Sequence, residues 1–159
     1  MKTEKKSAPV LKFAKPPHVA IVEARFYDHL NDLMLDGAKA ALEKSGATFE
    51  IITVPGAMEI PAAVQFLSQR KTGKPFDAFI ALGCVIRGAT SHYDIVCTES
   101  TRGLTDVALK HNLAVGNCIL TIENEAQALE RADKNQMDKA GGAALAALMM
   151  LQLKQNCGI

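Results

Sequence analysis

The strongest constraint on the fold of this chain is a regular alternation, from residue 18 onward, of short apolar runs with longer amphipathic stretches. Runs rich in aliphatic and β-branched residues predict strands at residues 18–24, 49–54, 76–86 and 113–121. Apolar residues three and four positions apart predict helices from residue 30 to Gly46, at 57–70, from about 92 to 111, at 124–131 and at 143–153. Strands that alternate with helices predict an α/β fold, in which a parallel sheet carries helices on both faces.

The length of 159 residues fits one domain. We expect residues 18–159 to form this domain and residues 1–17 to form an N-terminal arm, with residues 1–7 disordered. The formal net charge of +1 gives little long-range attraction for a polyanion, so we expect no nucleic-acid partner.

No apolar run approaches the roughly 20 residues that a membrane-spanning helix needs, and the basic N-terminus lacks the apolar core of a secretory signal. We therefore expect no membrane association. The cysteines do not pair at the close spacing of a zinc or redox motif, which predicts no metal site. Cys84 and Cys118 lie within apolar runs, where they are expected to be buried as free thiols. Such cysteines suit a reducing compartment, so we expect a cytoplasmic protein.

Ligands of parallel α/β sheets bind beyond the carboxyl ends of the strands. After the first predicted strand come Phe26 and Tyr27, whose rings could stack on a flat heterocycle or pack on the first helix. After the second come Gly56, which lets a ligand approach the backbone, and Glu59. Glu59 could accept hydrogen bonds from hydroxyl groups or complement the positive end of the next helix.

The loop after the third predicted strand is the most informative. Its small residues, Gly88, Ala89 and Thr90, allow backbone N–H groups to surround a phosphate. His92 follows at the start of a helix, where its imidazole could move protons near neutral pH or simply face solvent. After the fourth strand, Arg131 has the planar fork that suits phosphate, although an exposed cation in a last helical turn is also common.

Three stretches in the same order resemble the lumazine synthases, enzymes of riboflavin biosynthesis. They are Val54 to Pro61 (VPGAMEIP), Ala81 to Asp94 (ALGCVIRGATSHYD), and Glu123-Asn124 with Gln127 to Ala132 (QALERA). The resemblance covers roughly residues 19–151. It implies a flavodoxin-like fold with a four-stranded parallel sheet and no metal or redox cofactor. It also implies condensation of 5-amino-6-(D-ribitylamino)uracil with 3,4-dihydroxy-2-butanone 4-phosphate to 6,7-dimethyl-8-ribityllumazine, phosphate and water.

The resemblance also implies roles for individual residues. Phe26 would stack on the pyrimidine, Glu59 would bind the ribityl hydroxyls, and Arg131 would reach the phosphate from an adjoining subunit. His92 would be the catalytic proton shuttle. The substrate-binding residues implied are Phe26, Ala57, Met58, Glu59, Cys84, Val85, Ile86, Ala89, Thr90, Asn117, Arg131 and Lys139.

Some positions depart from the family pattern. Asn117 stands where an aromatic residue is frequent, and Tyr27 stands where a smaller polar residue is expected. The linker at residues 133–139 differs from that of capsid-forming members, which favours a pentamer or a dimer of pentamers over an icosahedral shell. Residues 10–13 are expected to add a strand to a neighbour's sheet.

Three alternatives remain open from the sequence. The chain could be a relative that binds a flavin or lumazine with little turnover. It could be a structural protein whose assembly is its function, or a flavodoxin-like nucleotide binder that needs no residue from a neighbouring subunit.

Overall fold

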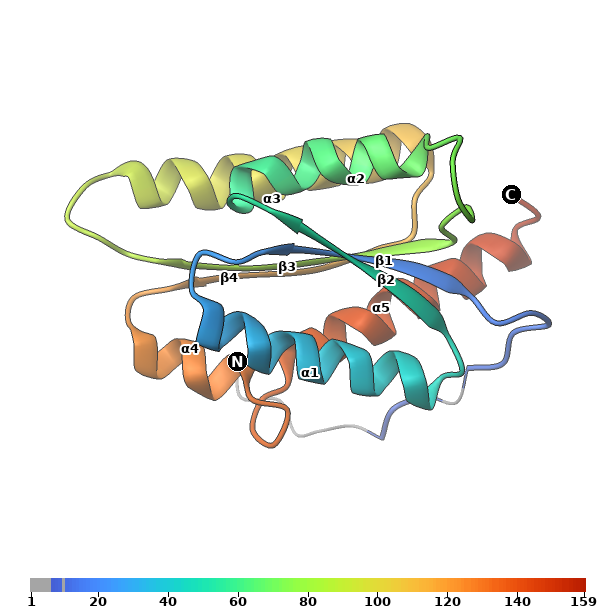
Figure 1. Ribbon diagram of the computed structural model, residues 1–159, viewed down its shortest axis with the longest axis horizontal. Coiled ribbons are helices and arrows are strands. Elements are labelled where there is room, and N and C mark those ends of the chain that lie inside the picture. The colour runs from blue at the N-terminus through green and yellow to red at the C-terminus, as the bar shows by residue number, and fades with distance from the viewer. Residues whose placement is uncertain (1–6, 10) are drawn as a thin grey trace.

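A computed structural model describes residues 7–9 and 11–159 and contains a four-stranded sheet. The strands are β1 (His18–Ala24), β2 (Thr48–Val54), β3 (Ala78–Ile86) and β4 (Val115–Ile122). All neighbouring strands are parallel, in the order β2-β1-β3-β4 (Figure 1). This flavodoxin-like order reverses its winding direction between β1 and β3, where such folds bind ligands. The predicted α/β architecture is confirmed.

Helices cover both faces of the sheet, as the alternation predicts (Figure 1). Helices α1 (Asp28–Lys44), α4 (Glu125–Ala132) and α5 (Lys139–Asn156) lie on one face. Helices α2 (Ile60–Ser68) and α3 (His92–His111) lie on the other, and a single 3-10 turn, η1 (Ala57–Glu59), precedes α2. Each parallel strand therefore returns to the sheet through a helical crossover.

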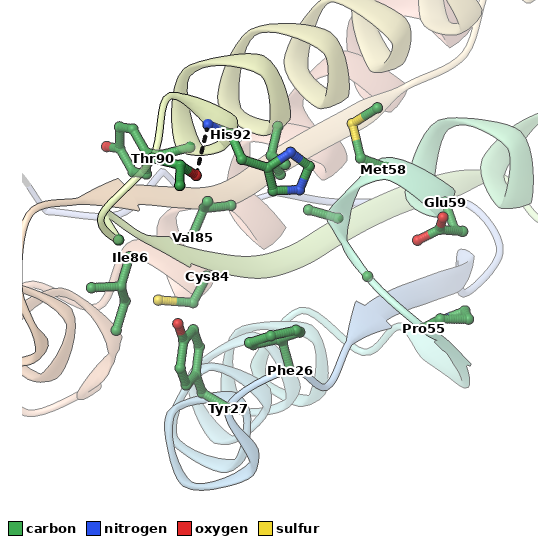
Figure 2. A pocket seen from close by; sticks show the side chains of 15 residues that line it. Phe26, Tyr27, Pro55, Met58, Glu59, Cys84, Val85, Ile86, Thr90 and His92 are labelled. Atoms are coloured by element: carbon green, nitrogen blue, oxygen red, sulfur yellow. Dashed lines mark hydrogen bonds between the residues drawn. The ribbon is translucent and has the colours of Figure 1, made fainter.

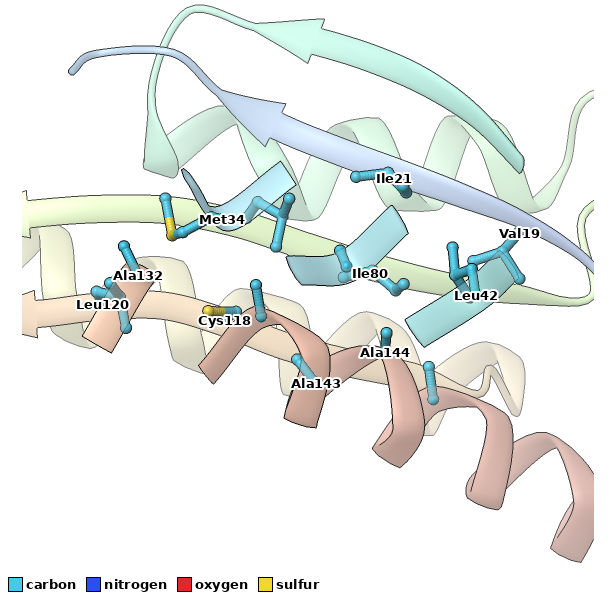
Figure 3. Packing of buried hydrophobic residues seen from close by; sticks show 14 of the residues in the cluster. Val19, Ile21, Met34, Leu42, Ile80, Cys118, Leu120, Ala132, Ala143 and Ala144 are labelled. Atoms are coloured by element: carbon cyan, nitrogen blue, oxygen red, sulfur yellow. The ribbon is translucent and has the colours of Figure 1, made fainter. Parts of the chain in front are cut away.

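Strand periodicity divides the buried residues into two cores. Val19 and Ile21 point toward α1 and α5, whereas Ala20 and Val22 point toward α2 and α3. All seven residues of β1 are buried, because this central strand is covered on both faces. Figure 3 shows the first core, in which the small side chains of α5 lie against Ile80 and Cys118.

Small residues bring α5 close to the sheet. A Cβ atom at Gly116 of β4 would collide with the carbonyl oxygen of Ala143 in α5. The apolar residues of α5 buried in this layer include Ala140, Ala143, Ala144 and Ala147. Close backbone approach at Gly116 is therefore a requirement of this layer.

Several predicted boundaries differ from the structure, most by one or two residues. The helix predicted at 57–70 divides into η1 and α2, and α5 begins at Lys139, four positions before the predicted 143. The earlier start follows from Asp138, whose side chain caps α5. The third strand begins at Ala78 because Asp77 turns its carboxylate to the backbone N–H of His18, at 2.8 Å.

The N-terminal arm is described only in part. Residues 1–6 and 10 are not among the described residues. They comprise most of the segment predicted to be disordered and the first residue of the predicted added strand. Leu11 and Phe13 pack against the core on the α1 and α5 face. None of the described helices is both long and apolar enough to cross a membrane.

Candidate active site

A cavity of about 650 Å³ opens at the carboxyl ends of β1, β2 and β3 (Figure 2). It lies at the edge of the sheet that the fold reserves for ligands. Its lining comes from five segments: the β1–α1 turn, the β2–α2 connection, the end of β3, the loop between β3 and α3, and the start of α3. The lining residues are Phe26, Tyr27, Pro55, Gly56, Ala57, Met58, Glu59, Cys84, Val85, Ile86, Gly88, Thr90, His92, Tyr93 and Val96.

The cavity brings together most residues that the sequence singled out. Those that line it are Phe26, Ala57, Met58, Glu59, Cys84, Val85, Ile86, Thr90 and His92. Ala89 lies in the same loop, between the lining residues Gly88 and Thr90, but does not itself line the cavity. The aromatic ring, the carboxylate and the imidazole of the predicted site therefore face one volume.

Phe26 and Tyr27 form one side of the cavity, across from His92 (Figure 2). Their rings meet edge to face, with centroids 5.0 Å apart. Tyr27 is half-buried against the core, whereas Phe26 is 72% exposed. Of the two arrangements open from the sequence, packing on the core applies to Tyr27 only. A Phe ring held in solvent beside a cavity is available to stack on a flat ligand.

An ion-pair network fixes the turn that carries these rings. The Arg25 guanidinium donates to the buried carboxylate of Glu23 at 3.1 Å, to Asp28 at 3.0 Å, and to Asp32. Glu23 also accepts from Thr53 Oγ1 at 2.9 Å, which ties the turn to β2. The hydrogen bond to Asp32 is the main cause that raises the pKa of Arg25. Arg25 is occupied by carboxylates and thereby supports the turn.

The β2–α2 connection places Glu59 at the cavity. Glu59 precedes α2 but makes no side-chain capping hydrogen bond to it. A Cβ atom at Gly56 would lie 3.1 Å from Glu59 Oε2, so the glycine leaves room for this carboxylate. Glu59 therefore does not cap the helix directly, and its carboxylate oxygens can accept hydrogen bonds from a ligand.

The loop after β3 is held from outside the cavity. Arg87 donates to Glu123 at 2.8 Å, lies within 3.4 Å of the Asp94 carboxylate, and covers the Tyr93 ring at 4.1 Å. Its hydrogen bonds to Glu123 and Asp94 raise the pKa of Arg87. Within the loop, Thr90 Oγ1 accepts from the backbone N–H of His92 at 3.4 Å. This bracing presents Gly88, Thr90 and the amino end of α3 to the cavity.

Cys84 contributes a thiol to the lining but little acidity. Burial raises its pKa to about 12, so the thiol stays protonated at neutral pH. Burial also raises the pKa of Tyr27. The lining also includes the imidazole of His92. No group of three or more His, Cys, Asp or Glu side chains in the described part of the chain is arranged to hold a metal ion.

Comparison with known proteins agrees with this geometry. A sequence profile of the family described as 6,7-dimethyl-8-ribityllumazine synthase matches residues 16–155. The chain belongs to this family. It is 56% identical to 6,7-dimethyl-8-ribityllumazine synthase 1 of Rhizobium meliloti (strain 1021), over 91% of this chain and 95% of that protein. It is 53% identical to the 6,7-dimethyl-8-ribityllumazine synthase of Agrobacterium fabrum, over 89% and 97%, and 56% identical to that of Sphingopyxis alaskensis, over 89% and 98%.

Besides Ala89, three residues that the lumazine synthase resemblance singled out do not line this cavity. Asn117 lies on the edge strand β4, where its Oδ1 accepts from Ile119 N at 2.9 Å. Arg131 lies in the last turn of α4 and donates to Gln127 O at 3.1 Å, and Lys139 begins α5 with its side chain exposed. All three groups therefore lie outside the cavity.

Several lining residues of this lumazine synthase family member were not singled out as site residues. Tyr93 and Val96 belong to the first turns of α3, and Val96 stands four positions after His92. Helical spacing could have identified Val96, because residues four apart share one face. Tyr27 was considered with Phe26 as a stacking ring and as a departure from the family pattern but was not assigned to the site, yet it lines the cavity beside Phe26.

Proposed function

We propose that this chain condenses 5-amino-6-(D-ribitylamino)uracil with 3,4-dihydroxy-2-butanone 4-phosphate and releases 6,7-dimethyl-8-ribityllumazine, phosphate and water. The observation that carries the proposal is the shared cavity of Phe26, Glu59, Thr90 and His92 in a member of this family. An aromatic face, a carboxylate, a small-residue loop and an imidazole are the groups that these two substrates require.

The uracil substrate binds on the β1 and β2 side of the cavity. Phe26, exposed to 72%, stacks on the pyrimidine ring, and Glu59 accepts hydrogen bonds from the ribityl hydroxyls. Ala57 and Met58 contact the ring edge and the ribityl chain. Backbone groups at the end of β3 complete this half, at the residues Cys84, Val85 and Ile86.

The phosphate of the second substrate binds at the loop between β3 and α3. Backbone N–H groups of Ala89 and Thr90 face the anion, supported by the positive end of the twenty-residue helix α3. Arg131 reaches the phosphate from the neighbouring subunit with its planar fork of donors. In the proposed complex, the butanone carbonyl lies near the amine of the stacked uracil.

The reaction then needs positioning and proton movement. The uracil amine attacks the ketone and the adduct loses water to form an imine. Elimination of phosphate then leaves an enol that becomes a ketone, and the ribitylamino nitrogen attacks this ketone and closes the ring with loss of a second water. His92 moves protons during these steps. Holding two reactants in place can remove about 7–11 kcal/mol of a barrier, whereas acid–base catalysis contributes roughly a hundred- to ten-thousand-fold. Positioning is therefore the larger contribution.

The active protein is a homo-oligomer, because Asn117, Arg131 and Lys139 complete the cavity of an adjoining subunit. We infer a pentamer or a dimer of pentamers in the cytoplasm. The exposed positions of Lys139 and Asn117 support this inference, since both are free to meet another subunit. Light scattering on the purified protein measures the number of subunits.

The test is a two-substrate assay that follows lumazine absorbance, run on wild type, Arg131→Ala and the control Lys71→Ala. Lys71 is an exposed cation in the turn between α2 and β3, so its variant matches the loss of charge. We expect Arg131→Ala to raise the KM for the phosphate substrate about tenfold or more and to leave the KM for the uracil substrate unchanged. Absence of turnover in wild type would indicate a flavin- or lumazine-binding protein instead.

The His92→Ala variant tests the balance between positioning and proton transfer. Turnover should fall by roughly a hundred- to ten-thousand-fold and remain measurable, because the cavity still holds both substrates. Complete loss of activity in a variant that still folds and binds the uracil substrate would contradict this division of roles.

A further inference from the structure

The linker between α4 and α5 contains an unusual backbone. Asp138 adopts the left-handed conformation, with φ 48° and ψ 53°. This conformation crowds the Cβ atom of most residues, and Asp and Asn tolerate it best after glycine. A left-handed residue other than glycine persists where the surrounding structure holds it in place, and such residues concentrate at functional sites. The contacts of Asp138 show what holds it.

Hydrogen bonds tie Asp138 to both sides of the linker. Its carboxylate Oδ1 accepts from Gly141 N at 3.1 Å, and its carbonyl oxygen accepts from Gly142 N at 3.0 Å. Its own backbone N–H donates to the carbonyl oxygen of Asp133 at 3.1 Å. Asp138 therefore closes the linker turn and caps the first turn of α5 at the same time.

The carboxylate of Asp138 also lies against α1. A Cβ atom at Gly37 of α1 would collide with Asp138 Oδ1, and one at Gly141 would collide with Oδ2. Two glycines on two helices thus leave the space that this side chain fills. The start of α5 is fixed relative to α1 by this contact as well as by the apolar core.

Lys139 follows Asp138 directly and is the first residue of α5. Its exposed side chain leaves the helix at a point set by the left-handed residue before it. On the other side of the linker, Met137 N donates to Glu130 O at 3.0 Å, next to Arg131. The two cations assigned to the neighbour's cavity are therefore carried by one hydrogen-bonded unit.

We propose that Asp138 is a positioning residue of the reaction, which holds Lys139 where it completes the cavity of the adjoining subunit. The proposal rests on the proposed function, because it acts through Lys139. Asp138 itself contacts no substrate, and its effect depends on its backbone conformation and on the space at Gly37.

The first test compares Asp138→Asn with Asp138→Ala. Asparagine tolerates the left-handed conformation and offers a capping oxygen, so kcat/KM should stay near that of wild type. Alanine loses both properties and should lower kcat/KM about ten- to a hundred-fold, as small misplacements of substrate-positioning groups do. Equal kcat/KM values for wild type and Asp138→Ala, in a folded oligomer, overturn the proposal.

The second test perturbs the same contact from α1. Gly37→Ala introduces a methyl group that pushes against Asp138, and it should lower kcat/KM in the same direction as Asp138→Ala. Gly142→Ala is the matched control, because a Cβ atom there meets nothing within 4 Å in the subunit and the helix favours alanine. Its kcat/KM should equal that of wild type.

A double-mutant cycle with Lys139→Ala separates positioning from general stability. If Asp138 acts through Lys139, adding Asp138→Ala to Lys139→Ala causes no further loss of kcat/KM. Equal fold losses in both backgrounds, or full activity of Lys139→Ala alone, overturn the proposal while leaving the proposed function intact. Absence of turnover in wild type overturns the proposed function and this proposal together.

Discussion

The two ends of the sheet differ in how far their polar side chains are hydrogen-bonded within the chain. At the amino ends of β1 and β2, the His18 ring bonds to Thr48 at 2.7 Å and to Glu50 at 2.9 Å, and stacks on Phe76 at 5.1 Å. Arg70 makes two hydrogen bonds to Glu50, at 3.0 and 2.9 Å, and lies 3.8 Å from the centre of the Phe76 ring. These groups satisfy one another.

At the carboxyl ends, polar and aromatic groups remain available. Phe26 is exposed, and Glu59 makes no capping hydrogen bond. Asn31, in the first turns of α1, is fully buried and both atoms of its amide lack a hydrogen-bond partner among the described residues. The comparison teaches that the amino end pairs its polar groups with one another, whereas the carboxyl end, beside the paired Arg25 and Arg87 networks, leaves Phe26 and Glu59 lining the cavity. Function is expected where local satisfaction is incomplete.

The largest effect should come from Gly116→Ala, near the amino end of β4. The added methyl group collides with the backbone oxygen of Ala143, which cannot move without displacing α5. We expect a loss of about 3 kcal/mol or more in the free energy of unfolding, measured by urea denaturation. Gly142→Ala, with open space around it, should be neutral or stabilising by up to about 1 kcal/mol. Wild-type stability of Gly116→Ala would show that α5 is loosely packed.

At the carboxyl end of the sheet, Phe26→Ala should lower kcat/KM and leave the free energy of unfolding nearly unchanged. Removing a stacking ring should lower kcat/KM about ten- to a hundred-fold. Because the ring is 72% exposed, the free energy of unfolding should change by less than about 0.5 kcal/mol. Phe66→Ala on α2 is the control, since that ring is 70% exposed and does not line the cavity. Equal kcat/KM for Phe26→Ala and wild type would remove Phe26 from the site.

The same contrast explains how far the sequence could predict the structure. The fold was predictable because period and apolarity are local properties, and they placed every strand within two residues at its start. The site at the carboxyl end of the sheet was predictable because its residues directly follow predicted strands. The His18 cluster was not, because its members come from separate parts of the chain and meet only after folding.

Two further features lay beyond the sequence for different reasons. The left-handed Asp138 lies in a polar linker without periodicity, so no local pattern marked the start of α5 at Lys139. Arg131 was a phosphate-binding candidate from its position after the fourth strand, but the assignment of Asn117, Arg131 and Lys139 to a neighbour's cavity came from the family resemblance alone. The chain's own periodicity gives no sign that residues of β4, α4 and α5 serve a cavity at β1, β2 and β3, and in the structure these residues lie outside it.

A smaller effect should follow from Asn31→Leu, which tests whether the unsatisfied amide costs stability. Leucine has a similar volume and no polar atoms, so the variant should gain about 1 kcal/mol in the free energy of unfolding. Urea denaturation measures it, with Asn156→Leu at an exposed position of α5 as the control. A loss of stability instead would mean that the Asn31 amide gains a partner in the assembled protein.

The smallest expected effect concerns Glu50. It is a change in the free energy of unfolding that depends on pH and is measured in acid. Hydrogen bonds from Arg70, and then from His18, lower the pKa of Glu50 from 4.5 to about 2. The unfolded chain therefore binds this proton first as the pH falls, so the stabilisation is complete above about pH 4.5 and is lost toward about pH 2. Urea denaturation at about pH 6 and pH 3 should show a smaller acid loss for Glu50→Gln than for wild type. Identical acid losses would mean that Glu50 is not held by this cluster, and that the amino end of the sheet is less closed than its hydrogen bonds indicate.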